Sequence, residues 1–153
     1  MRVAIIGTGG MGSWFAKEFL KTEEVAVYDT NKIKMTAIKN AKHLNSLSDL
    51  QLFNPEFLLN AVRIQNTIEV FESAAKYINR DCIISDIASI KEEIPDYYLQ
   101  CPFPFASFHP MFGPQFADLN QVKEENVIII AESDTKAKKF LKTFFNRFNF
   151  SIF

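Results

Sequence analysis

Three glycines near the amino terminus have the spacing G-x-G-x-x-G, in the segment Gly7-Thr8-Gly9-Gly10-Met11-Gly12. Such a turn, directly after a strand and at the start of a helix, is typical of dinucleotide-binding domains. The first glycine permits the tight turn, the second lets the backbone approach a pyrophosphate, and the third lets helix and strand pack closely. Amides at the helix N-terminus then face the phosphates. We therefore expect all six residues of this turn to contact a bound dinucleotide.

An acidic residue, Asp29, ends the next apolar run about 20 residues after the turn. A carboxylate at this place accepts hydrogen bonds from the adenosine ribose hydroxyls. Its charge would repel a 2′-phosphate, so we expect NAD rather than NADP, although Lys32 and Lys34 could soften that repulsion. The alternative is that the glycines only make a tight turn and Asp29 only caps a helix.

Two later segments could supply the reactive part of a site. Residues 86–91 follow one expected strand, and residues 108–114 follow the next. Both segments then lie at the carboxyl edge of a parallel sheet, where doubly wound folds bind ligands. At that edge they can meet over the nicotinamide.

The elements that must position these residues alternate between strands and helices. Apolar, β-branched runs predict strands at residues 2–6, 25–28, 57–62, 82–87, 105–108, 127–131 and 150–153. Helical periodicity predicts helices after the glycine turn, in the lysine-rich stretch after Asp29, at residues 67–78, and in a last stretch from Ala137 to Phe148. Residues 45–55 predict a short edge strand or a helical turn. This pattern predicts an α/β, Rossmann-type, doubly wound and mainly parallel sheet with helices on both faces.

Length, charge and cysteine content limit the function classes. With 153 residues, 48% of them hydrophobic, we expect a single domain over residues 1–153. The net charge of -1 is spread over interleaved residues, so we expect a small-molecule partner and neither nucleic acid nor membrane. Cys82 and Cys101 lack metal-ligand spacing, so we expect no metal site and a reducing, cytoplasmic location. No apolar stretch reaches the length of a signal peptide core or a membrane span.

The glycine turn, the D-x-A-S-x-K segment at residues 86–91 and the H-P-M-F-G-P segment at residues 109–114 together resemble the prephenate and arogenate dehydrogenase family. The resemblance covers essentially the whole chain. It implies NAD-dependent oxidative decarboxylation of prephenate to 4-hydroxyphenylpyruvate, a step of tyrosine biosynthesis. It also implies that His109 is the catalytic histidine and that Ser89 hydrogen-bonds it. Whether prephenate or arogenate is the substrate stays open.

These residue types suit that chemistry. An imidazole that titrates near neutrality can accept the hydroxyl proton of the substrate as hydride leaves for NAD. A serine behind the imidazole would fix its orientation and tautomer. As alternatives, His109 could be a polar surface residue, and Ser89 could begin a capping box with Glu92. We expect His43 to be solvated and Cys82 to be buried; Phe103, Phe105, Phe108 and Phe112 are more typical of a core than of substrate stacking.

The sequence departs from the family pattern in two places. The family usually has proline where this chain has Arg63, directly after Ala61 and Val62, and we expect these three residues to border the cofactor. Arg63 could pair with a phosphate or a substrate carboxylate, or be a plain surface arginine. The resemblance also implies a helical domain that forms the family's dimer and supplies an arginine for the substrate carboxylates, and we do not expect residues 1–153 to contain it.

Three functions are therefore compatible with the sequence. The first is the catalytic half of a prephenate or arogenate dehydrogenase, completed by another chain or by a homodimer. The second is a stand-alone NAD-binding module with a regulatory or protein-interaction role and little turnover. The third is another reductase of the same architecture, such as a β-hydroxyacid dehydrogenase or a pyrroline carboxylate reductase, whose motifs we do not find in place of H-P-M-F-G-P.

Overall fold

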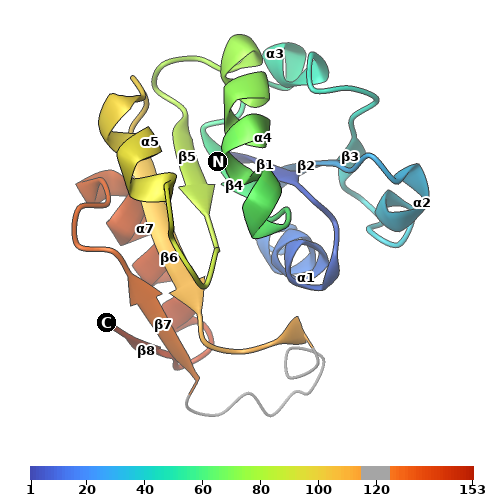
Figure 1. The fold of residues 1–153 in the computed structure, drawn as a ribbon. Helices are drawn as coiled ribbons and strands as arrows, with labels where there is room; N and C mark the ends of the chain where they lie inside the picture. Colours follow the sequence, from blue (N-terminus) through green and yellow to red (C-terminus); the bar gives the residue numbers. More distant parts are fainter. Residues whose placement is uncertain (115–124) are drawn as a thin grey trace.

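Short apolar runs form the strands of an eight-stranded sheet in the computed structural model, which describes residues 1–114 and 125–153 (Figure 1). The strands are β1 (Arg2–Ile6), β2 (Glu24–Tyr28), β3 (Lys42–His43), β4 (Phe57–Asn60), β5 (Ile83–Asp86), β6 (Phe105–Pro110), β7 (Asn126–Ile129) and β8 (Ser151–Ile152). Their order across the sheet is β3-β2-β1-β4-β5-β6-β7-β8. All neighbours pair in parallel except β6 and β7, which are antiparallel. The order of the strands reverses between β1 and β4, and ligands of doubly wound sheets bind beside such a switch point.

The helices cover both faces of this sheet. One face carries α1 (Gly10–Phe19), α2 (Lys32–Met35) and α7 (Thr135–Asn146), and the other carries α3 (Asp49–Phe53), α4 (Thr67–Ala74) and α5 (Ile94–Gln100). Short 3-10 turns, η1 (Ile64–Asn66) and η2 (Ala75–Tyr77), flank α4. Within β1, Val3 and Ile5 point to the first face, and Ala4 and Ile6 point to the second. Since alternate residues of a strand face opposite sides of the sheet, a continuous apolar run buries side chains on both faces.

Aromatic side chains join α1 and α7 over the first face. Phe15 is fully buried, and its ring centroid lies 5.7 Å from that of Phe108 in β6. Phe19 and Phe144 have ring centroids 4.4 Å apart. This aromatic contact explains why the apolar stripe predicted from Ala137 onward forms a helix that lies against α1.

The fold class predicted from the sequence is confirmed. The predicted burial of the phenylalanines and of Cys82 and the predicted exposure of His43 are confirmed as well. Phe103, Phe108 and Phe112 are buried and Phe105 is partly buried. Cys82 is buried, and His43 is exposed at the β3 edge. None of the described helices has the length and apolarity needed to cross a bilayer.

Several predicted boundaries were wrong. The strand expected at residues 57–62 ends at Asn60, whose side-chain amide donates to the Thr67 carbonyl at 2.9 Å and holds the turn toward α4. The helix expected at residues 67–78 is divided into α4 and η2. The lysine-rich helix after Asp29 is a single turn, α2. For residues 45–55 the predicted helical turn is confirmed by the short helix α3, whereas the edge strand β3 lies before this segment.

The strand that carries His109 is longer than predicted. It continues through Pro110, so His109 lies in β6 and not in the loop after it. The parallel neighbour β5 stops at Asp86, opposite Ser107, and beyond that point β6 pairs only with β7. Proline is tolerated there because it need not donate to a second neighbour. The histidine therefore has a fixed backbone at the carboxyl edge of the sheet.

Candidate active site

The glycine turn begins where β1 ends. Gly7 has a φ of 93°, and a Cβ atom there would lie 2.8 Å from the carbonyl carbon of Ala61. A Cβ atom on Gly12 would collide with the carbonyl oxygen of Gly7. These two glycines are thus required by the packing of α1 against β1 and the loop after β4. Gly9 is exposed, and among residues 1–114 and 125–153 no atom lies within 4 Å of the position of its Cβ atom, so these residues leave its backbone accessible to a ligand.

Asp29 holds the turn from the end of β2. Its Oδ2 accepts the amide of Thr8 at 2.7 Å and the hydroxyl of Thr8 at 3.0 Å, and its Oδ1 accepts the amide of Asn31 at 2.8 Å. Burial raises the pKa of the Asp29 carboxyl, but these hydrogen bonds and the charge of Lys34 outweigh burial and hold the pKa below its usual value. The buried side chain of Thr8 therefore faces Asp29, so the amide and the hydroxyl of Thr8 are both already engaged.

A small cavity lies beside Asp29. It has a volume of about 240 Å³ and is lined by Gly7, Tyr28 and Val62 among others. Lys32 does not reach into it, because its ammonium donates to the carbonyls of Leu44 at 3.2 Å and Asn45 at 2.7 Å. One Asp29 oxygen, Oδ1, retains room for a further donor from this cavity, since a carboxylate oxygen accepts two hydrogen bonds.

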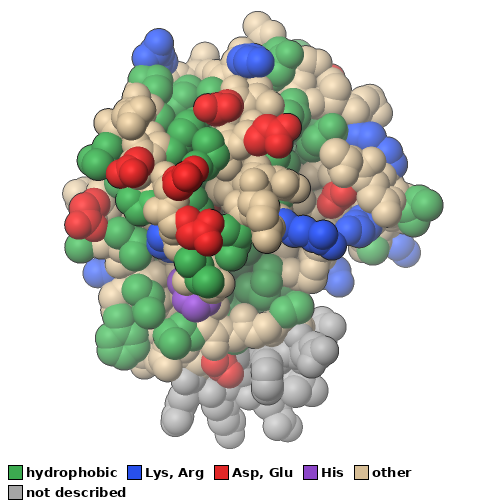
Figure 2. Space-filling model, viewed as in Figure 1, with side chains coloured by type: hydrophobic (Ala, Val, Ile, Leu, Met, Phe, Trp, Pro, Cys, Tyr) green, Lys and Arg blue, Asp and Glu red, His purple; other side chains and the backbone are tan. Residues whose placement is uncertain are grey.

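A larger cavity of about 530 Å³ lies on the other side of Val62. It is lined by Met11 of α1, residues 61–65 after β4, residues 87–89 after β5, and His109, Pro110 and Phe112. The structure thus brings together His109, Ser89 and Arg63, which are far apart in the sequence. Figure 2 shows the molecule hollowed at this edge of the sheet, below the acidic side chains that gather over α4 and α5.

His109 is half-buried at the wall of this cavity. Burial and the nearby charge of Lys91 lower the pKa of its imidazole below the ordinary value of 6.5. The imidazole is therefore neutral at neutral pH, which is the form that can accept a proton. Glu125 shares a neighbouring cavity with it.

Ser89 is exposed in the bend after β5, and no hydrogen bond joins it to His109 in the structure. The capping box expected for Ser89 and Glu92 was wrong. The helix that follows, α5, begins only at Ile94, and Glu92 has a φ of 39°, outside the helical region. Ser89 thus lies in the same cavity as His109 with its hydroxyl free of a helix-capping role.

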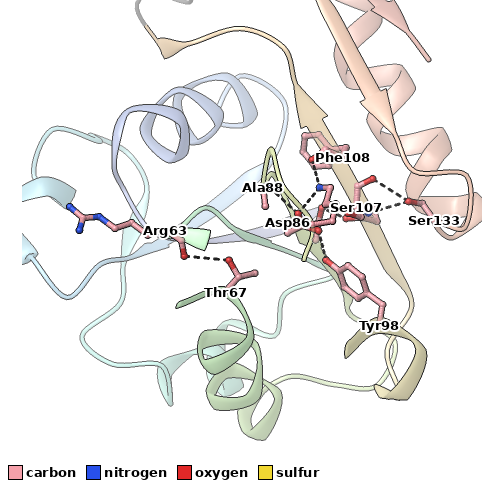
Figure 3. Close-up of polar contacts among 11 residues, drawn as sticks. Arg63, Thr67, Asp86, Ala88, Tyr98, Ser107, Phe108 and Ser133 are labelled. Atoms are coloured by element: carbon pink, nitrogen blue, oxygen red, sulfur yellow. Dashed lines mark hydrogen bonds and ion pairs between the residues drawn. The ribbon is translucent and has the colours of Figure 1, made fainter. Parts of the chain in front are cut away.

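A buried polar cluster, which we call the Asp86 cluster, joins the ends of β5 and β6 (Figure 3). Asp86 accepts the hydroxyl of Tyr98 at 2.8 Å, the amide of Ala88 at 2.9 Å and the ammonium of Lys91 at 2.7 Å. The same ammonium donates to the carbonyl of Phe108 at 3.0 Å. Burial, followed by the charge of Asp86, raises the pKa of Tyr98 well above its usual value, so its hydroxyl remains a donor.

No pattern in the sequence assigned a role of their own to Asp86, Lys91 or Tyr98. The available signal was the D-x-A-S-x-K segment, in which the first and last residues form the ion pair. No sequence pattern indicated a polar role for Tyr98, since a tyrosine in an apolar helix is typical of a buried core position.

Arg63 is exposed at the mouth of the larger cavity. Its backbone carbonyl accepts the hydroxyl of Thr67 at 3.4 Å, and in Figure 3 its side chain points away from the Asp86 cluster. It forms no ion pair with a residue in the described ranges 1–114 and 125–153. Within the same ranges no group of His, Cys, Asp and Glu side chains is arranged to hold a metal ion.

Comparison with known proteins identifies one family. The family model described as "Prephenate dehydrogenase, nucleotide-binding domain" matches residues 15–149. Arogenate dehydrogenase 1, chloroplastic, from Arabidopsis thaliana is 28% identical over 121 residues, which are 75% of this chain and 19% of the plant protein. A probable arogenate/prephenate dehydrogenase from Methanocaldococcus jannaschii is 28% identical over 147 residues, 88% of this chain and 31% of that protein.

Solved structures show the same fold. Prephenate dehydrogenase from Aquifex aeolicus superposes with a TM-score of 0.82 at 20% identity, over 99% of this chain and 60% of that chain. Its complex with hydroxyphenyl propionate and NAD+ superposes with a TM-score of 0.78 at 18% identity, over 100% of this chain and 59% of that chain. The chain thus spans less than a third of the two curated relatives and about three fifths of the solved enzyme.

Proposed function

The chain belongs to the family of prephenate dehydrogenase nucleotide-binding domains, and from this premise we propose that it binds NAD and oxidises prephenate or arogenate. The observation that carries the proposal is the larger cavity, in which His109 and Ser89 lie beside the loop that packs on the glycine turn. A neutral imidazole in this cavity supports the proposal, because a base is needed beside the nicotinamide that we propose to enter there.

We propose that the dinucleotide spans the two cavities on either side of Val62. The adenosine ribose would meet Asp29 Oδ1 in the smaller cavity, the pyrophosphate would lie over Gly9 and the N-terminus of α1, and the nicotinamide would enter the larger cavity. Gly9, Gly10 and Met11 would contact the phosphates through their backbone, whereas Thr8 would act through Asp29. Ala61 and Val62 would border the cofactor between the two cavities.

NAD fits the smaller cavity better than NADP. The ionised carboxylate of Asp29 would repel a 2′-phosphate, and the ammonium of Lys32 is already engaged by the carbonyls of Leu44 and Asn45. The enzyme from Aquifex aeolicus was solved with NAD+, which agrees with this preference.

The proposed reaction uses the chain's own residues for proton transfer and orientation. His109 accepts the proton of the substrate's ring hydroxyl as the hydride on the same carbon leaves for NAD, which acts as the hydride acceptor. The ring carboxylate then leaves as carbon dioxide, and its bonding electrons complete the aromatic ring. The phenolate oxygen takes back the proton from His109, which gives 4-hydroxyphenylpyruvate or its arogenate counterpart and restores the neutral imidazole. Ser89 would orient the imidazole through a hydrogen bond that forms between its hydroxyl and His109 when the substrate is bound.

We expect a further protein segment to cover the larger cavity on the side where the substrate would bind. A helical domain of the same protein, a second copy or another chain would supply it, together with a cation for the substrate carboxylates. Closure of that kind excludes water and fixes the reacting atoms, so we expect it to be required for full activity.

One experiment tests the proposal directly. The purified chain is titrated with NAD in a calorimeter, and prephenate or arogenate is then added while the absorbance of reduced cofactor is followed. Turnover that disappears in His109→Ala, with NAD affinity retained, would support the proposal. NAD binding without turnover of either substrate would instead favour a binding module, and absence of binding to both NAD and NADP would overturn the proposal.

A further inference from the structure

Lys91 connects the ends of β5 and β6, two residues after the segment 87–89 that lines the larger cavity. Its ammonium lies 2.7 Å from a carboxylate oxygen of Asp86 in β5 and 3.0 Å from the carbonyl oxygen of Phe108 in β6. That carbonyl belongs to the peptide bond that leads into His109. The backbone of the histidine is thereby tied to the end of the neighbouring strand, at the point where β5 no longer pairs with β6.

The ammonium cannot readily swing away. Its side chain is only 18% exposed, and Asp86, which holds it, is 1% exposed. Asp86 is fixed in turn by the hydroxyl of Tyr98 and the amide of Ala88. A lysine on the surface samples many rotamers, whereas this one is held by two acceptors that are themselves fixed.

The charged groups near His109 come from each of the surrounding segments. Lys91 follows β5, Arg63 follows β4 across the larger cavity, and Glu125 precedes β7 in the neighbouring cavity. Apart from burial, the charge of Lys91 is what lowers the pKa of the imidazole. Asp86 accepts a hydrogen bond from the ammonium at 2.7 Å, so its negative charge is engaged by Lys91.

We propose that Lys91 is a positioning residue for His109: it holds the backbone immediately before the histidine and keeps its ammonium fixed at this end of β6. The Asp86 cluster then contributes to the site as well as to folding, because it holds the Lys91 ammonium in place. The catalytic consequence rests on the function proposed above: a neutral imidazole is ready to accept the substrate proton over a wider range of pH.

The test measures the imidazole directly. The chain contains two histidines, so NMR titration of the ring protons resolves His109 and uses exposed His43 as an internal reference. In Lys91→Met we expect the pKa of His109 to rise, because the nearby cation that disfavours the charged imidazole has been removed. Lys91→Arg keeps the charge, so the pKa of His109 should stay near that of the unaltered protein.

Lys91→Met alone leaves Asp86 buried without its partner, which can unfold the protein. The double variant Asp86→Asn with Lys91→Met removes both charges and should fold, as checked by circular dichroism, and it should still raise the pKa of His109. Tyr98→Phe is the matched control, since it removes a hydrogen bond of the same cluster but leaves the ammonium in place. A folded double variant in which His109 titrates as in the unaltered protein would overturn the proposal, as would an equal rise in Lys91→Arg.

A second readout applies to the chain with NAD and substrate. The acid limb of kcat/KM should move to higher pH in the double variant by the same amount as the imidazole titration. A matching shift supports the proposal, and an acid limb that stays in place while the imidazole shifts would overturn its catalytic part. Because the titration needs no substrate, failure of the chain to oxidise prephenate or arogenate would count against the proposed function and leave the positioning by Lys91 to be decided by the NMR result.

Discussion

Asp29 at the end of β2 accepts two hydrogen bonds from Thr8 in the glycine turn, one from its amide at 2.7 Å and one from its hydroxyl at 3.0 Å. The residue that we propose to hold the adenosine ribose thus also holds the loop that we propose to receive the phosphates. The proposed contact with the ribose and the shape of the turn therefore depend on the same carboxylate.

This coupling predicts the effect of Asp29→Asn. We expect NAD affinity to fall at least tenfold, because the variant loses both a charged acceptor for the ribose and part of the support of the turn, while the preference for NAD over NADP decreases. Calorimetric titration with each cofactor measures both effects. Thr8→Val, which removes only the hydroxyl bond, should lose less affinity and keep the cofactor preference. Equal preference ratios in Asp29→Asn and in the unaltered chain would contradict this account.

Two glycines of the same turn should respond in opposite ways to alanine. Gly12→Ala places a methyl group against the carbonyl of Gly7, so we expect a loss of at least about 2 kcal/mol in the free energy of unfolding. Gly9→Ala meets no atom of the described residues within 4 Å, so stability should change by less than about 1 kcal/mol while NAD binding weakens. Urea denaturation and calorimetry separate the two effects. Retained NAD affinity in Gly9→Ala would show that the phosphates do not approach this residue.

The pH dependence of turnover follows from the lowered pKa of His109. A base must be neutral to accept a proton, so the rate should fall as the pH drops through the pKa of the imidazole. Since burial and Lys91 place that pKa below 6.5, the acid limb of kcat/KM should lie below pH 6.5, with the rate retained at neutral pH. A profile measured from pH 5 to 8 checks this. An acid limb above 6.5 would mean that another group, or a His109 with a raised pKa, controls the rate.

Ser89 should affect turnover and not folding. Its side chain is exposed and makes no bond to His109 in the absence of ligands, so Ser89→Ala should leave the unfolding midpoint unchanged. If it orients the imidazole during the reaction, kcat should fall about tenfold, the value of roughly one hydrogen bond, with NAD affinity retained. Ser89→Thr keeps the hydroxyl and should restore most of kcat. An unaltered kcat in Ser89→Ala would remove Ser89 from the mechanism.

Arg63 provides a test of the position that departs from the family pattern. We expect Arg63→Ala to weaken binding of NAD or to raise KM for the substrate about tenfold, because Arg63 is an exposed cation among the residues that line the larger cavity. Arg63→Lys should recover part of the loss, and Arg80→Ala, which removes an exposed arginine outside that cavity, is the matched control. If NAD affinity and turnover were both unchanged in Arg63→Ala, Arg63 would be a surface residue only.

Local patterns in the sequence were sufficient for the fold and for half of the site. The G-x-G-x-x-G spacing after β1 and the acidic end of β2 depend on residues near one another in the chain, so they predict the turn and its carboxylate without knowledge of the tertiary structure. The alternation of apolar strands with helical periodicity likewise predicts a sheet covered on both faces, because each run must bury its apolar side. The boundaries were less certain, since single contacts such as that between Asn60 and Thr67 decide where a strand ends.

Only the tertiary structure decided how the rest of the site is arranged. The sequence placed His109 in a loop, but the early end of β5 and the pairing of β6 with β7 put it on a rigid strand. It offered Ser89 as a helix cap, but α5 starts later and leaves the hydroxyl in the cavity. The contact of Lys91 with Asp86 and with the carbonyl before His109 joins residues separated by up to 17 positions. No local pattern encodes such a contact, because it depends on which strands become neighbours, and it sets the charge next to the proposed base.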